Sequence, residues 1–102
     1  MMPNVAIGDG AATVTTNHGC TAQTTSNEKS SKVFVTGIGV VRLGDLLTEH
    51  TIPAGPSCPP HVVPLTSASS KVFADGIAVG RQGDDYTGET ISDAGQTKVN
   101  AG

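Results

Sequence analysis

Apolar and polar residues alternate in two short, closely similar stretches of the chain. Residues 32–42 and 71–81 both begin with Lys-Val-Phe, pass through a turn that contains glycine, and end in an Ile-x-Val-x-Arg alternation. The turns are Thr36-Gly37 and Asp75-Gly76, and Asp-Gly is a residue pair that favours two-residue hairpin loops. Because a period of two is typical of strands, each stretch predicts a short β-hairpin.

These hairpins belong to a longer repeated unit. Residues 31–45 recur at residues 70–84 with ten identical positions in fifteen, and both copies end in Gly-Asp. Residues 3–9 resemble the second half of this unit and residues 96–102 its first half, with Lys98-Val99 standing where Lys32-Val33 stands. A chain whose two ends share one unit predicts three units around a closed ring, with pseudo-three-fold symmetry and adjacent first and last strands.

Three loops separate the units, at residues 10–30, 46–69 and 85–96. They are rich in Thr, Ser, Gly and Pro and show no helical periodicity. Loops longer than about 15 residues are uncommon in compact domains and usually serve a function. The sequence therefore predicts one all-β domain over residues 1–102, built from short hairpins and long functional loops.

The composition indicates that this domain has a thin hydrophobic core. The 102 residues include no Trp, one Tyr and two Phe. Small domains with few large side chains usually require a disulfide, a metal ion or a partner's surface for stability. Two cysteines and three histidines are the residues that could supply such a crosslink.

The charge of the chain argues against nucleic acid as a partner. Six Lys and Arg face nine Asp and Glu, and no basic run occurs that could neutralise a phosphate backbone. No apolar run approaches the roughly 18 residues that span a bilayer, and Met1-Met2-Pro3-Asn4 does not resemble the start of a signal peptide. We therefore expect synthesis in the cytoplasm, without a signal peptide or a membrane anchor.

All histidines and cysteines lie in the first two loops. The first loop contains His18 and Cys20, and the second contains His50, Cys58 and His61. In a three-unit ring, loops that leave equivalent strand ends converge at one pole. Four nitrogen and sulfur donors gathered there would suit a closed, tetrahedral zinc site, and the prolines of Cys58-Pro59-Pro60-His61 would stiffen the second loop.

Three other interpretations remain open at this point. Histidines in polar loops are often merely solvated. A disulfide between Cys20 and Cys58 would link the same two loops. A Cys/His pair, His18 with Cys20 or His61 with Cys58, could form a hydrolase site. Because the chain has neither a G-x-S-x-G nor an H-E-x-x-H motif, we expect neither an enzyme nor a small-molecule substrate.

The repeated units, the half units at both ends and the His/Cys loops together resemble the PAAR-repeat proteins. Gly39-Val40-Val41-Arg42 and Ala78-Val79-Gly80-Arg81 stand where that family has Pro-Ala-Ala-Arg, and only the arginine is kept. The resemblance implies a small three-sided β cone whose point is held by zinc, bound through three histidines and one cysteine. Carried over, the ligands are His18, His50, His61 and Cys58, with Cys20 as the competitor for the fourth position.

The resemblance also implies a function and a partner. PAAR-repeat proteins are non-enzymatic tips that cap and sharpen the trimeric β-helical spike of a contractile injection machine, with one cap per trimer. Such a tip acts in a phage tail, a type VI secretion system or an extracellular injection particle, and it contacts the target membrane transiently. The alternative function is that of a small binding domain stapled by a disulfide or a metal.

Overall fold

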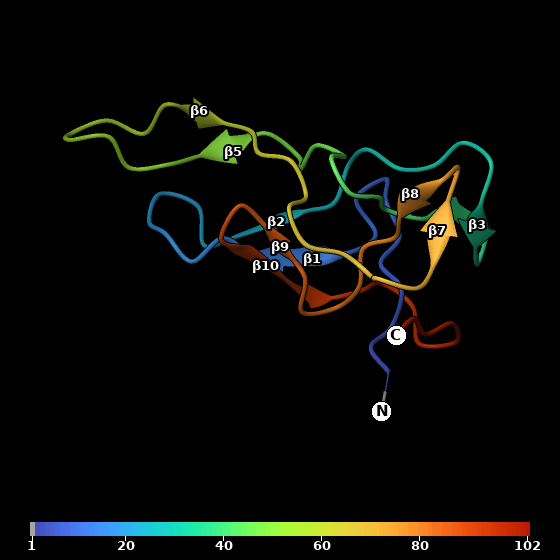
Figure 1. Ribbon diagram of the computed structural model, residues 1–102. Helices are drawn as coiled ribbons and strands as arrows, with labels where there is room; N and C mark the ends of the chain where they lie inside the picture. The colour runs from blue at the N-terminus through green and yellow to red at the C-terminus, as the bar shows by residue number, and fades with distance from the viewer. Residues whose placement is uncertain (1) are drawn as a thin grey trace.

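The computed structural model describes residues 2–102, and within that range it is an all-β domain without a helix (Figure 1). No helix of the described chain is therefore long and apolar enough to cross a membrane. The strands are β1 (Thr13–Thr15), β2 (Gln23–Thr25), β3 (Phe34–Val35), β4 (Ile38–Gly39), β5 (His50–Thr51), β6 (Pro60–His61), β7 (Phe73–Ala74), β8 (Ile77–Ala78), β9 (Asp85–Tyr86) and β10 (Glu89–Asp93). The predicted all-β class is confirmed.

Both predicted hairpins are present. Strands β3 and β4 pair antiparallel through the Thr36-Gly37 turn, and β7 and β8 pair through Asp75-Gly76. The four turn residues have positive φ, between 53° and 83°. Two consecutive residues in this left-handed region match the twist of the flanking strands, which is why glycine at the second position favours the turn.

The largest sheet is formed by segments that the sequence analysis treats as loops. Its strand order is β2-β1-β10-β9, so the first and the last thirds of the chain contribute to one sheet. Val14 of β1 and Ile91 of β10 face each other in the register and are buried. These strands have at most two buried residues each, and β2 has none, so the sequence does not distinguish them from loops.

The repeated units are joined by a cycle of backbone hydrogen bonds. The amide of Ala6 donates to the carbonyl of Gly80, that of Gly80 to Val41, and that of Val41 back to Ala6, at 2.9, 2.8 and 3.0 Å. The chain ends are also paired, because the amide of Ala101 donates to the carbonyl of Pro3 at 3.0 Å. Residues from the beginning, the middle and the end of the chain thus meet around one point.

The core consists of two groups of small and medium-sized side chains. The larger group surrounds Tyr86, the largest fully buried side chain, and includes Leu47, Leu65 and Ile91. The second group lies among the repeated units and contains Val5, Val40, Ala74, Val79 and Ala101. The thin core predicted from the composition is thus divided between two places.

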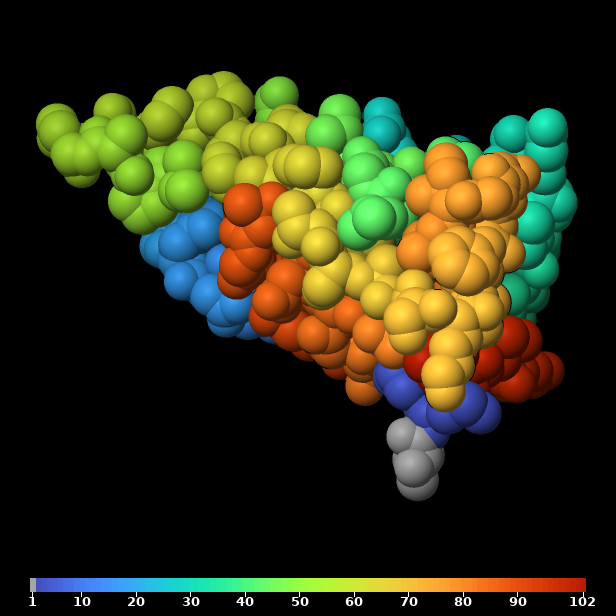
Figure 2. Space-filling view, in the orientation of Figure 1, coloured from blue at the N-terminus to red at the C-terminus, as the bar shows by residue number. Residues whose placement is uncertain are grey.

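The molecule is elongated, with principal extents of 42, 27 and 21 Å. Figure 2 shows one broad end, where the hairpins around β3 and β7 lie, and a taper toward the segment around residue 55. In Figure 1 this tapering segment is the β5–β6 hairpin, which projects beyond the four-stranded sheet. Strands β5 and β6 pair only with each other.

Candidate metal centre

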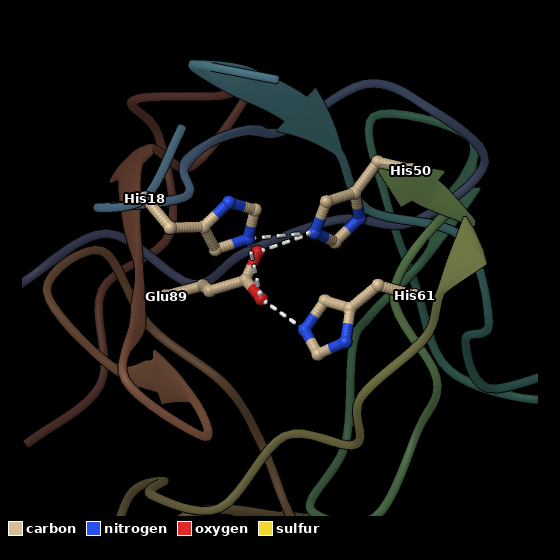
Figure 3. A group of neighbouring side chains, drawn as sticks. All are labelled: His18, His50, His61 and Glu89. Carbon is tan, nitrogen blue, oxygen red and sulfur yellow. Dashed lines mark hydrogen bonds and ion pairs between the residues drawn. The ribbon is translucent and has the colours of Figure 1, made fainter. Parts of the chain in front are cut away.

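Three histidines and a glutamate meet at the base of the β5–β6 hairpin (Figure 3). His18 lies in the loop between β1 and β2, and His50 and His61 are paired opposite each other across the hairpin. Glu89 is the first residue of β10. One potential ligand atom from each of the four residues lies within 4.8 Å of every other.

The Nε2 atoms of all three histidines point at the carboxylate of Glu89. The Nε2 atom of His50 lies 2.7 Å from Oε1, while those of His61 and His18 lie 2.8 and 3.3 Å from Oε2. His50 and Glu89 have side chains that are only 3% exposed, whereas His18 and His61 are about one-fifth exposed. The cluster is therefore sheltered on one side and reached by solvent on the other.

Backbone carbonyls set the orientation of two imidazole rings. Nδ1 of His18 lies 2.8 Å from the carbonyl oxygen of Gly19, and Nδ1 of His50 lies 2.9 Å from that of Thr48. A carbonyl can only accept, so Nδ1 carries the proton in both rings. In a neutral imidazole Nε2 is then the lone-pair nitrogen, which is the arrangement that orients histidines for metal binding.

With these lone pairs, the cluster has several acceptors and too little positive charge to balance them. Nε2 of His18 and Nε2 of His50 lie 3.3 Å apart, and both face a carboxylate that can itself only accept. Oε1 of Glu89 is buried and has no hydrogen-bond partner within residues 2–102, although Nε2 of His50 is close to it. A cation among the four side chains would satisfy all of these acceptors at once.

The spacing of the donors fits a small transition-metal ion. Tetrahedral ligands at the usual zinc distances lie about 3.3 Å from one another. His18 Nε2 lies at this distance from His50 Nε2 and from Glu89 Oε2, the other two histidines are closer to the carboxylate, and all four donors lie within 4.8 Å of one another. Three imidazoles and one carboxylate are a donor set that zinc accepts, as do several neighbouring divalent metals.

The structure brings together His18, His50 and His61, as the sequence analysis expects, but it does not bring Cys58 to them as the fourth donor. The sulfur of Cys58 is bonded to that of Cys20, 38 residues earlier. This corrects the assignment of Cys58, and equally that of its competitor Cys20, because a sulfur in a disulfide is not a thiolate ligand. The disulfide that the sequence leaves open is the arrangement present.

Glu89 is the candidate ligand that could not be identified from the sequence. It lies in the third loop, which has no histidine or cysteine and therefore offers no donor of the kind that the resemblance implies. The position of Glu89 on the buried face of a strand is the signal that could have identified it. Glu89 and Ile91 share one face of β10, both are buried, and a carboxylate on the buried face of a strand requires a partner.

The disulfide also bears on the hydrolase interpretation. Both cysteines of the chain are bonded to each other, so neither provides a free thiol. The catalytic pairs His18 with Cys20 and His61 with Cys58 therefore lack their nucleophile in this structure.

The cations of a second polar region, outside the cluster, are paired within the described chain. A shallow hollow of about 400 Å³ is lined by Asn27, Glu28, Lys29, Arg42 and Asp45. Its lysine pairs with Asp9, and its arginine pairs with Asp45 and Asp75. Neither cation is therefore left without a carboxylate partner.

A comparison of the chain with models of known protein families finds no match, and neither does a comparison with curated proteins.

Proposed function

We propose that this chain is a non-enzymatic, metal-stapled tip that caps the trimeric β-helical spike of a contractile injection machine. The observation that carries the proposal is the cycle of hydrogen bonds among Ala6, Val41 and Gly80, which joins three similar units into a closed ring. Such a ring gives a single chain three similar faces. A partner with a three-fold axis could contact all three alike.

The broad end of the molecule supports the proposal, because the three Lys-Val segments are held and exposed in the same way. In each, one buried side-chain oxygen accepts hydrogen bonds from both backbone amides of the segment. The acceptors are Ser30 Oγ for Lys32 and Val33, Ser69 Oγ for Lys71 and Val72, and Gln96 Oε1 for Lys98 and Val99. The valines are 39, 39 and 41% exposed.

This repetition indicates a docking surface on the broad end. The three valines are equally exposed, and each follows a lysine. Their positions relative to one another are set by the ring of units and not by one local sequence motif. Phe34 and Phe73, both 56% exposed, add apolar area beside two of them. We take these exposed valine and phenylalanine side chains as part of the binding surface.

The narrow end supports the other half of the proposal. A taper leaves little room for a hydrophobic core, so a metal bound by His18, His50, His61 and Glu89 would fix the base of the narrow β5–β6 hairpin in its place. Structural zinc sites contribute on the order of 10 kcal/mol to folding, which is comparable with the whole stability of a small domain. We propose zinc as the resident ion, one per chain, with a structural role.

In this mechanism the chain itself makes and breaks no bond. The spike transmits the force of contraction to the broad end, and the narrow end concentrates it on a small area of the target membrane. The chain's contribution is stiffness, which comes from the ring, the disulfide and the metal. Assembly would place it at the end of a phage tail or a secretion apparatus.

Binding to a spike tests the proposal directly. The chain would be co-expressed with trimeric β-helical spike proteins of contractile injection machines, and the mass of the complex would be measured by light scattering. We expect one copy of the chain per spike trimer. Val72→Asp should abolish the complex, while Val62→Asp, an equally exposed valine next to His61 at the other end, should not. A chain that remains monomeric with every such spike, or that binds three copies per trimer, contradicts the proposal.

A further inference from the structure

The disulfide joins the two halves of the candidate metal centre. Cys20 lies two residues after His18, and Cys58 lies three residues before His61. Two of the donors, His50 and His61, are carried by the projecting β5–β6 hairpin. The other two, His18 and Glu89, belong to the loop after β1 and to the neighbouring strand β10.

Few other bonds connect these two halves. Within residues 2–102, the hairpin beyond residue 50 is tied to the loop of His18 by the hydroxyl pair of Thr21 and Thr51, at 2.5 Å, and by the bond from the amide of Thr51 to Thr21 Oγ1, at 3.2 Å. The remaining links are the histidine contacts within the cluster itself. The base of the hairpin is anchored by the buried residues Leu47 and Val63, but β5 and β6 pair with no other strand, so the disulfide is the one covalent link between the hairpin and the loop of His18.

The loop that carries His18 is attached firmly on its other side. The side-chain amide of Asn17 donates to the carbonyl of Gly88 and to Thr90 Oγ1, at 2.9 and 3.2 Å, which ties the loop to β10. His18 and Glu89 are therefore held together without the disulfide. The disulfide adds a covalent restraint on where the hairpin histidines lie relative to them.

Both cysteines are exposed residues. Small thiols can therefore reach the disulfide, and exposed disulfides are the ones that exchange readily with them. Reduction consumes two thiol molecules, which supply two electrons and two protons. The S–S bond breaks, Cys20 and Cys58 become thiols, and the reagent leaves as its own disulfide.

We propose that the Cys20–Cys58 disulfide controls the metal affinity of the site formed by the three histidines and Glu89. The oxidised chain binds the ion tightly and the reduced chain binds it weakly. The physical reason is preorganisation: the crosslink restricts the hairpin before the ion arrives, so binding loses less conformational entropy. The chain would then hold its metal most firmly in an oxidising environment. This inference rests on the metal site within the proposed function, and it does not depend on the spike.

The test measures zinc affinity by competition with a chromogenic chelator at one pH, for the oxidised chain and for the chain reduced with a phosphine. The phosphine takes up the oxygen of a water molecule and leaves two thiols. We expect reduction to lower the affinity about 10- to 100-fold, the range seen when ligands are repositioned but not removed. The double variant Cys20→Ser, Cys58→Ser should show the same low affinity with and without the phosphine.

The contrary outcomes are distinct. If reduction leaves the affinity unchanged, or if only the reduced wild type binds more tightly, as it would with a cysteine thiolate as ligand, the inference is wrong. If the oxidised chain binds no zinc, the metal site itself is wrong, and the inference with it. Neither result bears on the binding of a spike.

A matched variant separates positioning from general loss of stability. Val79→Ala removes volume from the core group among the repeated units, which contains none of the candidate ligands, and should lower the unfolding temperature. With its disulfide intact, we expect this variant to keep wild-type zinc affinity at temperatures where it is folded. A comparable affinity loss in Val79→Ala would show that the disulfide acts only through global stability and would overturn the inference.

Discussion

Oε1 of Glu89 lies 2.7 Å from Nε2 of His50 but is not hydrogen-bonded to it. In the neutral imidazole of His50 the proton is on Nδ1, which faces the carbonyl of Thr48. The two atoms are then both acceptors, held together inside the molecule. They are explained together by an ion that both of them bind, and this explanation can be tested at Glu89.

Replacing the carboxylate by an amide should remove the metal. In Glu89→Gln the amide keeps the shape of the side chain but loses the negative charge that a divalent ion requires. Changes around metal ligands cost about 10- to 100-fold in affinity, so loss of a ligand should cost more than about 100-fold in zinc competition measurements. Glu49→Gln, an exposed neighbour of His50, is the control and should bind as the wild type does. Equal affinity of both variants would contradict the role of Glu89.

The only tyrosine of the chain predicts how stability changes at high pH. Burial, with a smaller contribution from the negative charge of Asp45, raises the pKa of Tyr86 well above its ordinary value of 10.0. Above pH 10 the unfolded chain loses this proton while the folded chain keeps it, so the free energy of unfolding decreases as the pH rises. The absorbance of tyrosinate should appear only together with unfolding, as followed by circular dichroism.

The matched variant for this experiment is Tyr86→Phe. The hydroxyl of Tyr86 is buried without a hydrogen-bond partner in the described chain, so its removal should leave stability at neutral pH unchanged or raise it by about 1 kcal/mol. The decrease in stability above pH 10 should be weaker in this variant. A loss of several kcal/mol at neutral pH would show that the hydroxyl has a partner.

Gln96 closes the ring at the ends of the chain. Its Nε2 donates to the carbonyls of Val5 and Val99, at 2.7 and 2.8 Å, and its Oε1 accepts from the amides of Lys98 and Val99. Gln96→Ala leaves these groups unpaired and should lower the free energy of unfolding by about 2–4 kcal/mol in urea titrations. Gln23→Ala, on the exposed strand β2, should change it by less than about 0.5 kcal/mol. Similar losses in Gln96→Ala and Gln23→Ala would indicate that Gln96 does not hold the two ends of the chain together.

Two arginine-aspartate pairs repeat along the chain, and they should contribute similarly to stability. Asp84 accepts hydrogen bonds from the amide, Nε and Nη2 of Arg81, as Asp45 does from Arg42. These bonds raise the pKa of each arginine. Asp84→Ala should lower the unfolding free energy by about 2 kcal/mol, because a nearly buried acceptor of three bonds is lost.

The second pair provides the comparison. Arg42 also pairs with Asp75, at 3.1 Å, so it keeps one partner in Asp45→Ala. Chemical denaturation should show a slightly smaller loss for Asp45→Ala than for Asp84→Ala. The opposite order would mean that the contact with Asp75 contributes nothing.

The hairpins could be predicted from the sequence because their information is local. Thr36-Gly37 and Asp75-Gly76 fix the turn, and the alternation on either side indicates the strands. The alternation does not fix burial, because Ile77 is exposed while Val79, two residues later, is buried. The four-stranded sheet could not be predicted in this way. Its strand β1 has one buried apolar residue, Val14, and its stability comes from the pairing with β10, which is about 80 residues away in the chain.

The candidate site, too, could be predicted from the sequence only in part. The three histidines are rare residues gathered in two loops, so composition alone identified them. Glu89 is one acidic residue among nine, and only the backbone position of β10 distinguishes it from the others. The fourth donor is thus determined by tertiary structure, which no spacing rule in the sequence expresses.

The pairing of Ala101 with Pro3 bears on the timing of folding in the cell. The pairing between residues 3–5 and residues 99–101 joins segments almost 100 residues apart. The nascent chain can form its local hairpins as they emerge, but this pairing has to wait until residues 99–101 have emerged as well. Until then the valines of the central units lack their covering, and the chain is most exposed to aggregation and proteolysis in that interval.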